Sequence, residues 1–144
     1  MSPAGQRAPA RTLYTPEILG AATALASFGW DESLPLKGDA RSRRCGSMLS
    51  LGLALDSSGR ISAVGLRAHA CAIGQAAAYA FASAAKGRTK DDIAAARAAL
   101  ADWLCGEGAM PAWPGIALVE PALGYPARHD AIMLAWDAAL VALG

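Results

Sequence analysis

The clearest pattern in the chain is an alternation of leucines with small or polar residues in "MLSLGLALD". Leu49, Leu51, Leu53 and Leu55 fall on one face of an extended strand, and small residues fall on the other. "DSSG" has the composition of a turn, and "RISAVGLRAHA" then returns as a second strand. The small face indicates either solvent or close approach of another backbone. A lone hairpin is marginally stable, so we expect helices to cover the leucine face.

Two helices are predicted on either side of this hairpin. "TPEILGAATALASFG" begins with Thr15 as an N-cap and Pro16 at the first helical position. The alanine-rich run after Cys71 is expected to continue to about Ala85, where "KG" ends it. Its N-terminus therefore falls directly after a cysteine.

Two more helices are predicted towards the C-terminus. "TKDD" resembles a capping box, with Thr89 as the N-cap of the third helix. The last helix follows Pro126, and its apolar stripe recurs every four residues at Ile132, Trp136 and Leu140. Residues 106–125, which contain several prolines, are predicted as a loop.

The order of these elements predicts an α+β fold. Strands and helices are segregated, which favours a small antiparallel sheet packed against helices over a parallel sheet. "SLPLKGDARSRRCGS" is predicted as a loop that adds at most a short edge strand to the hairpin. With 144 residues, the chain is expected to form one domain over 13–144, preceded by a loose Pro-, Ala- and Arg-rich tail over 1–12.

Charge and apolar content exclude several classes of protein. The formal net charge of +1 gives no indication of a nucleic-acid or membrane partner. No apolar run is long enough to span a bilayer, and "MSPAGQRAPAR" lacks the apolar core of a signal peptide. There are three cysteines and no CxxC pair. We therefore expect a cytoplasmic protein with reduced thiols that serve as core residues, nucleophiles or metal ligands.

Candidate chemistry centres on Cys45 and Cys71. One precedes the first strand of the hairpin and the other follows the second, so an antiparallel pairing brings both to the same end of the sheet. The start of a helix favours the thiolate at Cys71, and the basic run "RSRR" does so beside Cys45. The alternative is that both are buried core cysteines.

The other candidate residues carry weaker signals. His69 would share a strand face with Cys71 if the strand reaches that far. His129 and Asp130 lie in the first turn of the last helix, where the dipole alone accounts for an Asp. Cys105 is expected to be an exposed residue at a helix end. No HExxH, P-loop or GxSxG motif is present.

Three segments together resemble the IscU/SufU/NifU N-terminal family of iron–sulfur cluster assembly scaffolds. "GDARSRRCGSMLSLGLALDSSGRISAV" is similar to the first cysteine region of the family, and "LRAHACAIGQAAAYAFASAAKGRT" to the second. "YPARHDAIMLAWDAAL" is similar to the third, above all in the SufU branch. The resemblance implies a small α+β fold that holds a transient iron–sulfur cluster, or zinc, on three cysteines with an Asp or His.

The resemblance assigns the first two ligands to Cys45 and Cys71, but it fails at two other positions. Ser47 stands where an Asp commonly follows the Cys-Gly pair, and Ala131 stands where the third cysteine belongs. Asp130 or His129 is then expected to complete the ligand set, because zinc accepts mixed ligands and histidine can replace cysteine on a cluster.

Three functions follow from this resemblance. The first is a cluster scaffold or carrier with an atypical ligand set, which receives sulfur from a cysteine desulfurase and passes clusters to acceptor proteins. The second is a degenerate relative that binds or regulates a cysteine desulfurase. The third is a zinc-dependent sulfur acceptor. We expect the first, and we expect a carrier rather than an enzyme.

Overall fold

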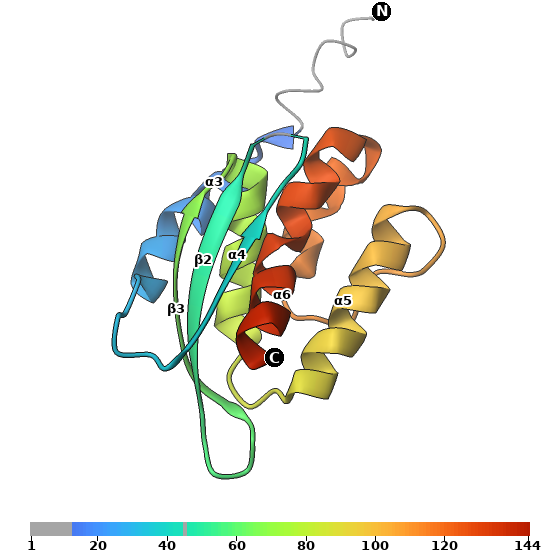
Figure 1. Ribbon diagram of the computed structural model, residues 1–144. Coiled ribbons are helices and arrows are strands. Elements are labelled where there is room, and N and C mark those ends of the chain that lie inside the picture. The colour runs from blue at the N-terminus through green and yellow to red at the C-terminus, as the bar shows by residue number, and fades with distance from the viewer. Residues whose placement is uncertain (1–12, 45) are drawn as a thin grey trace, which may run out of the picture.

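The computed structural model of the protein describes residues 13–44 and 46–144. A three-stranded antiparallel sheet has the order β1–β2–β3 (Figure 1). Its strands are β1 (Leu36–Arg41), β2 (Met48–Leu55) and β3 (Ile61–His69). The predicted hairpin and α+β fold are confirmed, and β1 is the additional edge strand. The tail predicted for residues 1–12 and Cys45 lie outside the described residues.

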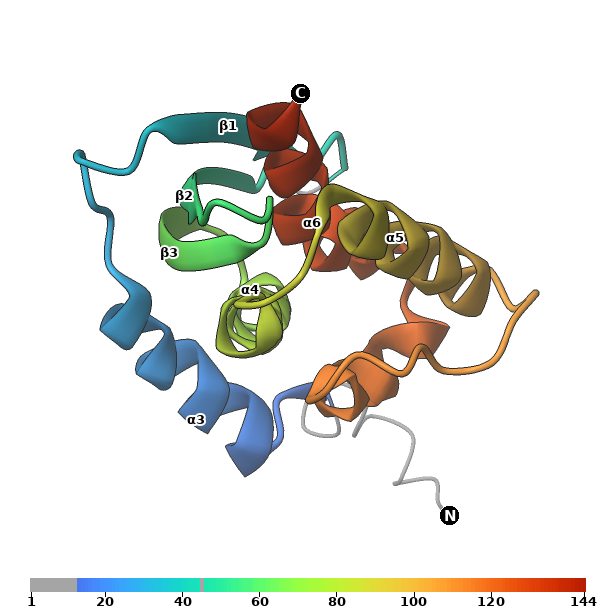
Figure 2. The ribbon, with the colours of Figure 1, turned by 90° about the horizontal axis from the view of Figure 1, so that it is seen from below.

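The helices form layers on one face of this sheet. They are α3 (Pro16–Ala24), α4 (Ala72–Ala84), α5 (Lys90–Leu104) and α6 (His129–Leu143), and α3 continues as the 3-10 turn η1 (Leu25–Phe28). Figure 2 shows α6 against the strands and beside α4, with α5 beyond α6 and α3 beyond α4. Within the described residues, no helix is both long and apolar enough to cross a bilayer.

Side-chain caps fix the predicted starts of two helices. The Thr15 hydroxyl oxygen accepts the N–H of Ile18 at 3.1 Å. Thr89 and Asp92 form a complete capping box at the start of α5. The backbone N–H of Thr89 donates to the Asp92 carboxylate and lowers its pKa. Both N-caps were predicted from the sequence.

The leucine face of β2 lies in the core, with one exception. Leu49, Leu51 and Leu53 are buried, as predicted, under α6. Leu55 is 38% exposed, so its prediction as a core residue was wrong. The pairing of β2 with β3 shifts register between Ala54 and Leu55, and such an irregularity redirects the side chains that follow it.

The small face of the hairpin contacts another backbone. Gly52 pairs with Gly65 across β2 and β3. A Cβ on Gly65 would lie 2.6 Å from the carbonyl oxygen of Gly29, and one on Gly52 would lie 3.1 Å from the Cβ of Leu34. Residues 29–34 therefore cross this face at a distance that side chains would prevent. Of the two alternatives left open by the sequence, close backbone approach is the correct one here.

The segment predicted as a loop over 106–125 is partly helical. Ile116–Gly124 forms the 3-10 helix η2, and Pro126–Arg128 forms η3. Ile116, Val119 and Ala122 are buried, and η2 packs on α4. Their spacing of three matches the three residues per turn of a 3-10 helix. The prediction that the prolines make this whole segment a loop was wrong. Pro121 lies inside η2, and the buried apolar residues of η2 stabilise the 3-10 helix.

Candidate functional site

One end of the sheet gathers the segments that carry the candidate ligands. Met48, at the start of β2, pairs with Arg41 at the end of β1 and with His69 at the end of β3. The connection between β1 and β2 is closed by the Ser42 N–H, which donates to the Ser47 carbonyl at 2.8 Å. Because Cys45 is outside the described residues, the position of its thiol stays a prediction.

Cys71 occupies the N-cap of α4, as the sequence predicted. Its backbone is extended, with φ −63° and ψ 167°, and its side chain makes no capping hydrogen bond. The Cys71 carbonyl accepts the N–H of Gln75 at 3.0 Å, and the Gln75 side-chain amide donates to the Ala70 carbonyl at 2.8 Å. These bonds fix the turn, and the half-buried thiol is not used by them.

His69 does not share a strand face with Cys71. β3 ends at His69, and two residues later the chain is already at the cap of α4. The condition for that pairing, a strand that reaches Cys71, is therefore not met. His69 is exposed, and it lies at the same end of the sheet as Met48, with which it pairs across the two strands.

Ala131 lies against the first turn of the helix that Cys71 caps. Its side chain is 1% exposed. A Cβ added to Gly74 would lie 3.2 Å from the Ala131 Cβ and 3.0 Å from the Ala70 Cβ. The position that the resemblance assigns to a third cysteine is thus next to the start of α4, where small residues let α6 approach closely.

His129 is oriented by a backbone carbonyl. Its Nε2 lies 3.0 Å from the carbonyl oxygen of Leu123. A carbonyl can only accept, so Nε2 is the nitrogen that donates in this contact, and in the neutral ring the lone pair is on Nδ1. A histidine held in this way is oriented as metal-binding histidines commonly are, with the non-ligating nitrogen donating to a carbonyl.

Asp130 lies between two hollows on the α5–α6 side. One, of about 250 Å³, is also lined by Arg97, Cys105 and His129. The other, of about 300 Å³, is also lined by Arg41, Arg43 and Arg97. Asp130 is half-buried in the first turn of α6. Its side chain is therefore close to charged groups from three elements.

Cys105 belongs to an exposed acidic group at the end of α5. Its Sγ–H donates to the Asp102 carbonyl at 3.4 Å. Partial desolvation, with a hydrogen bond and the charge of Glu107, raises the pKa of the Cys105 thiol. The ligand atoms of Asp102, Cys105 and Glu107 lie within 4.8 Å of one another. The sequence interpretation missed this group, although the spacing DxxCxE across a helix end could have indicated it.

The metal ligands predicted from the sequence do not form a close group of three among the described residues. Among residues 13–44 and 46–144, the Asp102, Cys105 and Glu107 group is the one set of three metal-binding side chains this close together. Cys71, His129 and Asp130 are thus not preassembled within that distance. The proposed set remains a prediction that needs Cys45.

Comparisons with known proteins identify similar structures. No protein-family model and no curated protein matches the chain. The crystal structure of a NifU-like nitrogen-fixing protein (N-terminal) from Brucella abortus matches with a TM-score of 0.81 and 28% identity, over 93% of this chain and 94% of that one.

A second structure is described as an iron–sulfur cluster assembly scaffold protein for the SUF system of Fervidobacterium islandicum AW-1. It matches with a TM-score of 0.80 and 22% identity, over 92% of this chain and 97% of that one. A third, a hypothetical protein, matches with a TM-score of 0.74 and 20% identity over 88% and 93%. The fold, with 28% identity to the NifU-like structure, supports the resemblance found in the sequence, and the chain has an IscU/SufU/NifU-like fold.

Proposed function

We propose that this protein is a scaffold or carrier for iron–sulfur cluster assembly with an atypical ligand set. Cys45 and Cys71 supply two thiolates, and Asp130 or His129 takes the place of the third cysteine. The observation that supports this most is the position of Cys71 at the start of α4, beside Ala131, in a fold that matches a NifU-like structure over 93% of the chain. The cluster is cargo that the protein receives and hands on.

The ligand set determines how tightly that cargo is held. Thiolates are the usual ligands of iron–sulfur clusters, and histidine can replace some of them. His129 offers Nδ1 for this purpose, because its Nε2 already donates to Leu123. A site with only two cysteines holds a cluster more weakly than one with three. Weak retention suits a carrier that must release its cluster to an acceptor protein.

Anaerobic reconstitution with iron and sulfide tests the proposal. We expect visible absorbance from a cluster in the unaltered protein and its loss in Cys71→Ala and in Cys45→Ala, because each removes one of only two thiolates. Cys105→Ala is the matched control, since it removes an exposed thiol that bonds within its own helix end. A protein that stays colourless without substitution would contradict the proposal, as would loss of the signal in the control alone.

Ala131→Cys is expected to strengthen cluster binding. The side chain would enter next to the first turn of α4, where the third thiolate of the resemblance belongs. We expect slower loss of visible absorbance to an added iron chelator than in the unaltered protein, with a similar initial spectrum. Ala131→Ser controls for the added volume without a thiol. Equal loss rates for the cysteine and serine variants would show that position 131 does not face the cluster.

The small residue at position 131 also favours a second candidate, a partner of a cysteine desulfurase that builds no cluster. If this candidate is correct, the double variant Cys45→Ala/Cys71→Ala should still bind to an immobilised SUF-type cysteine desulfurase, because binding would not need a cluster. Zinc held by the same cysteines with His129 or Asp130 would instead support the sulfur-acceptor function. Metal analysis of protein purified without oxygen distinguishes iron, zinc and an empty site.

A further inference from the structure

One face of the molecule carries opposite charges on its two sides, with the first turns of α6 between them. On one side, Arg41 and Arg43 line the hollow of about 300 Å³ beside Asp130. On the other side, Cys105 at the end of α5 lines the hollow of about 250 Å³. The two hollows share three lining residues, which are Arg97, Asp130 and Met133. They therefore form one surface, the charged face, where β1 ends, α5 ends and α6 begins (Figure 1).

The basic side of the charged face holds arginines that the rest of the chain does not use. The side chains of Arg41, Arg43 and Arg44 are exposed, and within the described residues they make no hydrogen bond, ion pair or ring contact. Every other described arginine makes such a contact, namely Arg60, Arg67, Arg88, Arg97 and Arg128. Three guanidinium groups within four residues repel one another, so this side gains from carboxylates outside its own chain.

The acidic side holds two carboxylates that are also outside any ion pair. Asp102 and Glu107 are exposed at the end of α5, and their oxygens lie within 4.8 Å of each other and of the Cys105 Sγ. In the part of the chain that the structure describes, neither carboxylate is paired with a basic side chain, the arginines at the end of β1 included. Both sides of the charged face thus keep their charge.

The arrangement is complementary to a second copy of itself. A two-fold axis that lies in the charged face and passes between its two sides, near Met133, brings the arginines of each copy opposite the carboxylates of the other. Contacts in such an isologous dimer occur in reciprocal pairs, so each ionic contact forms twice. A nucleic acid or an anionic membrane would instead meet the carboxylates together with the arginines, and the carboxylates would repel it.

We propose that the charged face is a self-association surface through which two copies of this chain form a dimer with two-fold symmetry. The dimer needs neither a metal nor a cluster, so it does not depend on the proposed function. His129 and Asp130 line the same hollows. Association therefore covers this edge of the candidate site and competes with any partner protein that docks there.

Reversing the charge of each side tests this pairing in the full chain without metal. Arg41→Glu/Arg43→Glu opposes negative to negative charge in a self-associated pair, and Asp102→Arg/Glu107→Arg opposes positive to positive. Each variant alone should dissociate about tenfold or more readily than the unaltered protein, because several weak exposed pairs are replaced by repulsions at once. An equimolar mixture of the two variants restores both attractive contacts and should form a heterodimer. Sedimentation velocity at rising protein concentration measures each dissociation constant.

Salt and a charge-matched variant provide the controls. Added salt should weaken the unaltered dimer, because it screens exposed charges. Glu17→Arg/Glu120→Arg adds the same charge as Asp102→Arg/Glu107→Arg, but at exposed positions of α3 and η2 outside the charged face. We expect it to form no heterodimer with Arg41→Glu/Arg43→Glu, because its own acidic side is still negative.

Four outcomes would overturn the proposal. They are an unaltered protein that stays monomeric at the highest concentration, a dimer that both reversals leave unchanged, equal heterodimer formation by the charge-matched variant, and assembly that continues beyond a dimer. If a reversal prevents folding, as judged by circular dichroism, the neutral variants Arg41→Gln/Arg43→Gln and Asp102→Asn/Glu107→Gln test the same contacts. Each neutral variant should weaken the dimer, and an unchanged dissociation constant in both would equally contradict the inference.

Discussion

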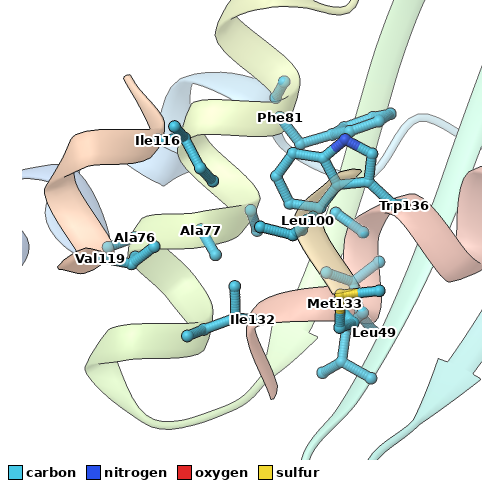
Figure 3. Packing of buried hydrophobic residues seen from close by; sticks show 14 of the residues in the cluster. Leu49, Ala76, Ala77, Phe81, Leu100, Ile116, Val119, Ile132, Met133 and Trp136 are labelled. Atoms are coloured by element: carbon cyan, nitrogen blue, oxygen red, sulfur yellow. The ribbon is translucent and has the colours of Figure 1, made fainter. Parts of the chain in front are cut away.

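Trp136→Ala is expected to lower the free energy of unfolding by about 3–5 kcal/mol, the range for a buried tryptophan. Trp136 is fully buried at the centre of the core. Its ring meets Phe81 edge to face at a centroid distance of 5.3 Å (Figure 3). It meets the ring of Trp113 at 5.4 Å, also edge to face. The substitution removes both aromatic contacts and leaves a cavity between α4 and α6. Urea unfolding followed by circular dichroism measures the loss.

Trp136→Phe is the matched control for this prediction. The indole Nε1 of Trp136 is buried and has no hydrogen-bond partner within the described residues. Because an unpaired buried N–H costs about 1–3 kcal/mol, its removal offsets part of the lost packing. We expect the phenylalanine variant to retain most of the stability. A loss as large as that of the alanine variant would show that aromatic packing is not the main contribution of this side chain.

Gly38→Ala is expected to destabilise the protein by about 1–3 kcal/mol or more, as overpacking of a core does. A Cβ at this position of β1 would lie 2.2 Å from the carbonyl oxygen of Ala138 and 2.7 Å from the backbone nitrogen of Ala142. Both atoms belong to the backbone of α6, so neither can move without shifting the helix. The midpoint of urea unfolding should fall accordingly.

Gly20→Ala provides a control with the same chemical change. Gly20 is exposed within α3, and an added Cβ would meet no atom within 4 Å. Since glycine is about 0.8–1.0 kcal/mol less favourable than alanine inside a helix, this variant should gain stability. The two glycine substitutions should therefore have opposite signs. Destabilisation by both would point to a general intolerance of alanine and would contradict the role assigned to Gly38.

The parts of the fold that the sequence predicted correctly are those determined by short stretches of neighbouring residues. The alternation in β2, the N-caps Thr15 and Thr89, and the start of α4 at Cys71 each follow from a few adjacent residues. The meeting of the strand ends near Met48 and His69 follows from antiparallel pairing. The segments for the candidate site were therefore predictable to the level of which end of the sheet they occupy.

Features that depend on contacts between distant segments were not predictable. The exposure of Leu55 depends on a register shift. The helical form of η2 depends on burial against α4. The hollow of about 300 Å³ beside Asp130 brings together side chains from β1, α5 and α6, and no sequence spacing encodes that meeting. The ligand geometry around Cys45 and Cys71 is of the same kind, which is why it must be tested by substitution.

The contact of β1 with α6 at Gly38 has a consequence for how this protein tolerates change. The strand and the helix touch through main-chain atoms, and the same two elements carry Arg41 and Asp130 at their other ends. At Gly38 this contact contains no side chain of the strand, while Leu36 and Ala40, on either side of it, pack against the core. Residues of β1 that face away from α6 take no part in this contact, so their exchange should leave the position of the strand against the helix unchanged.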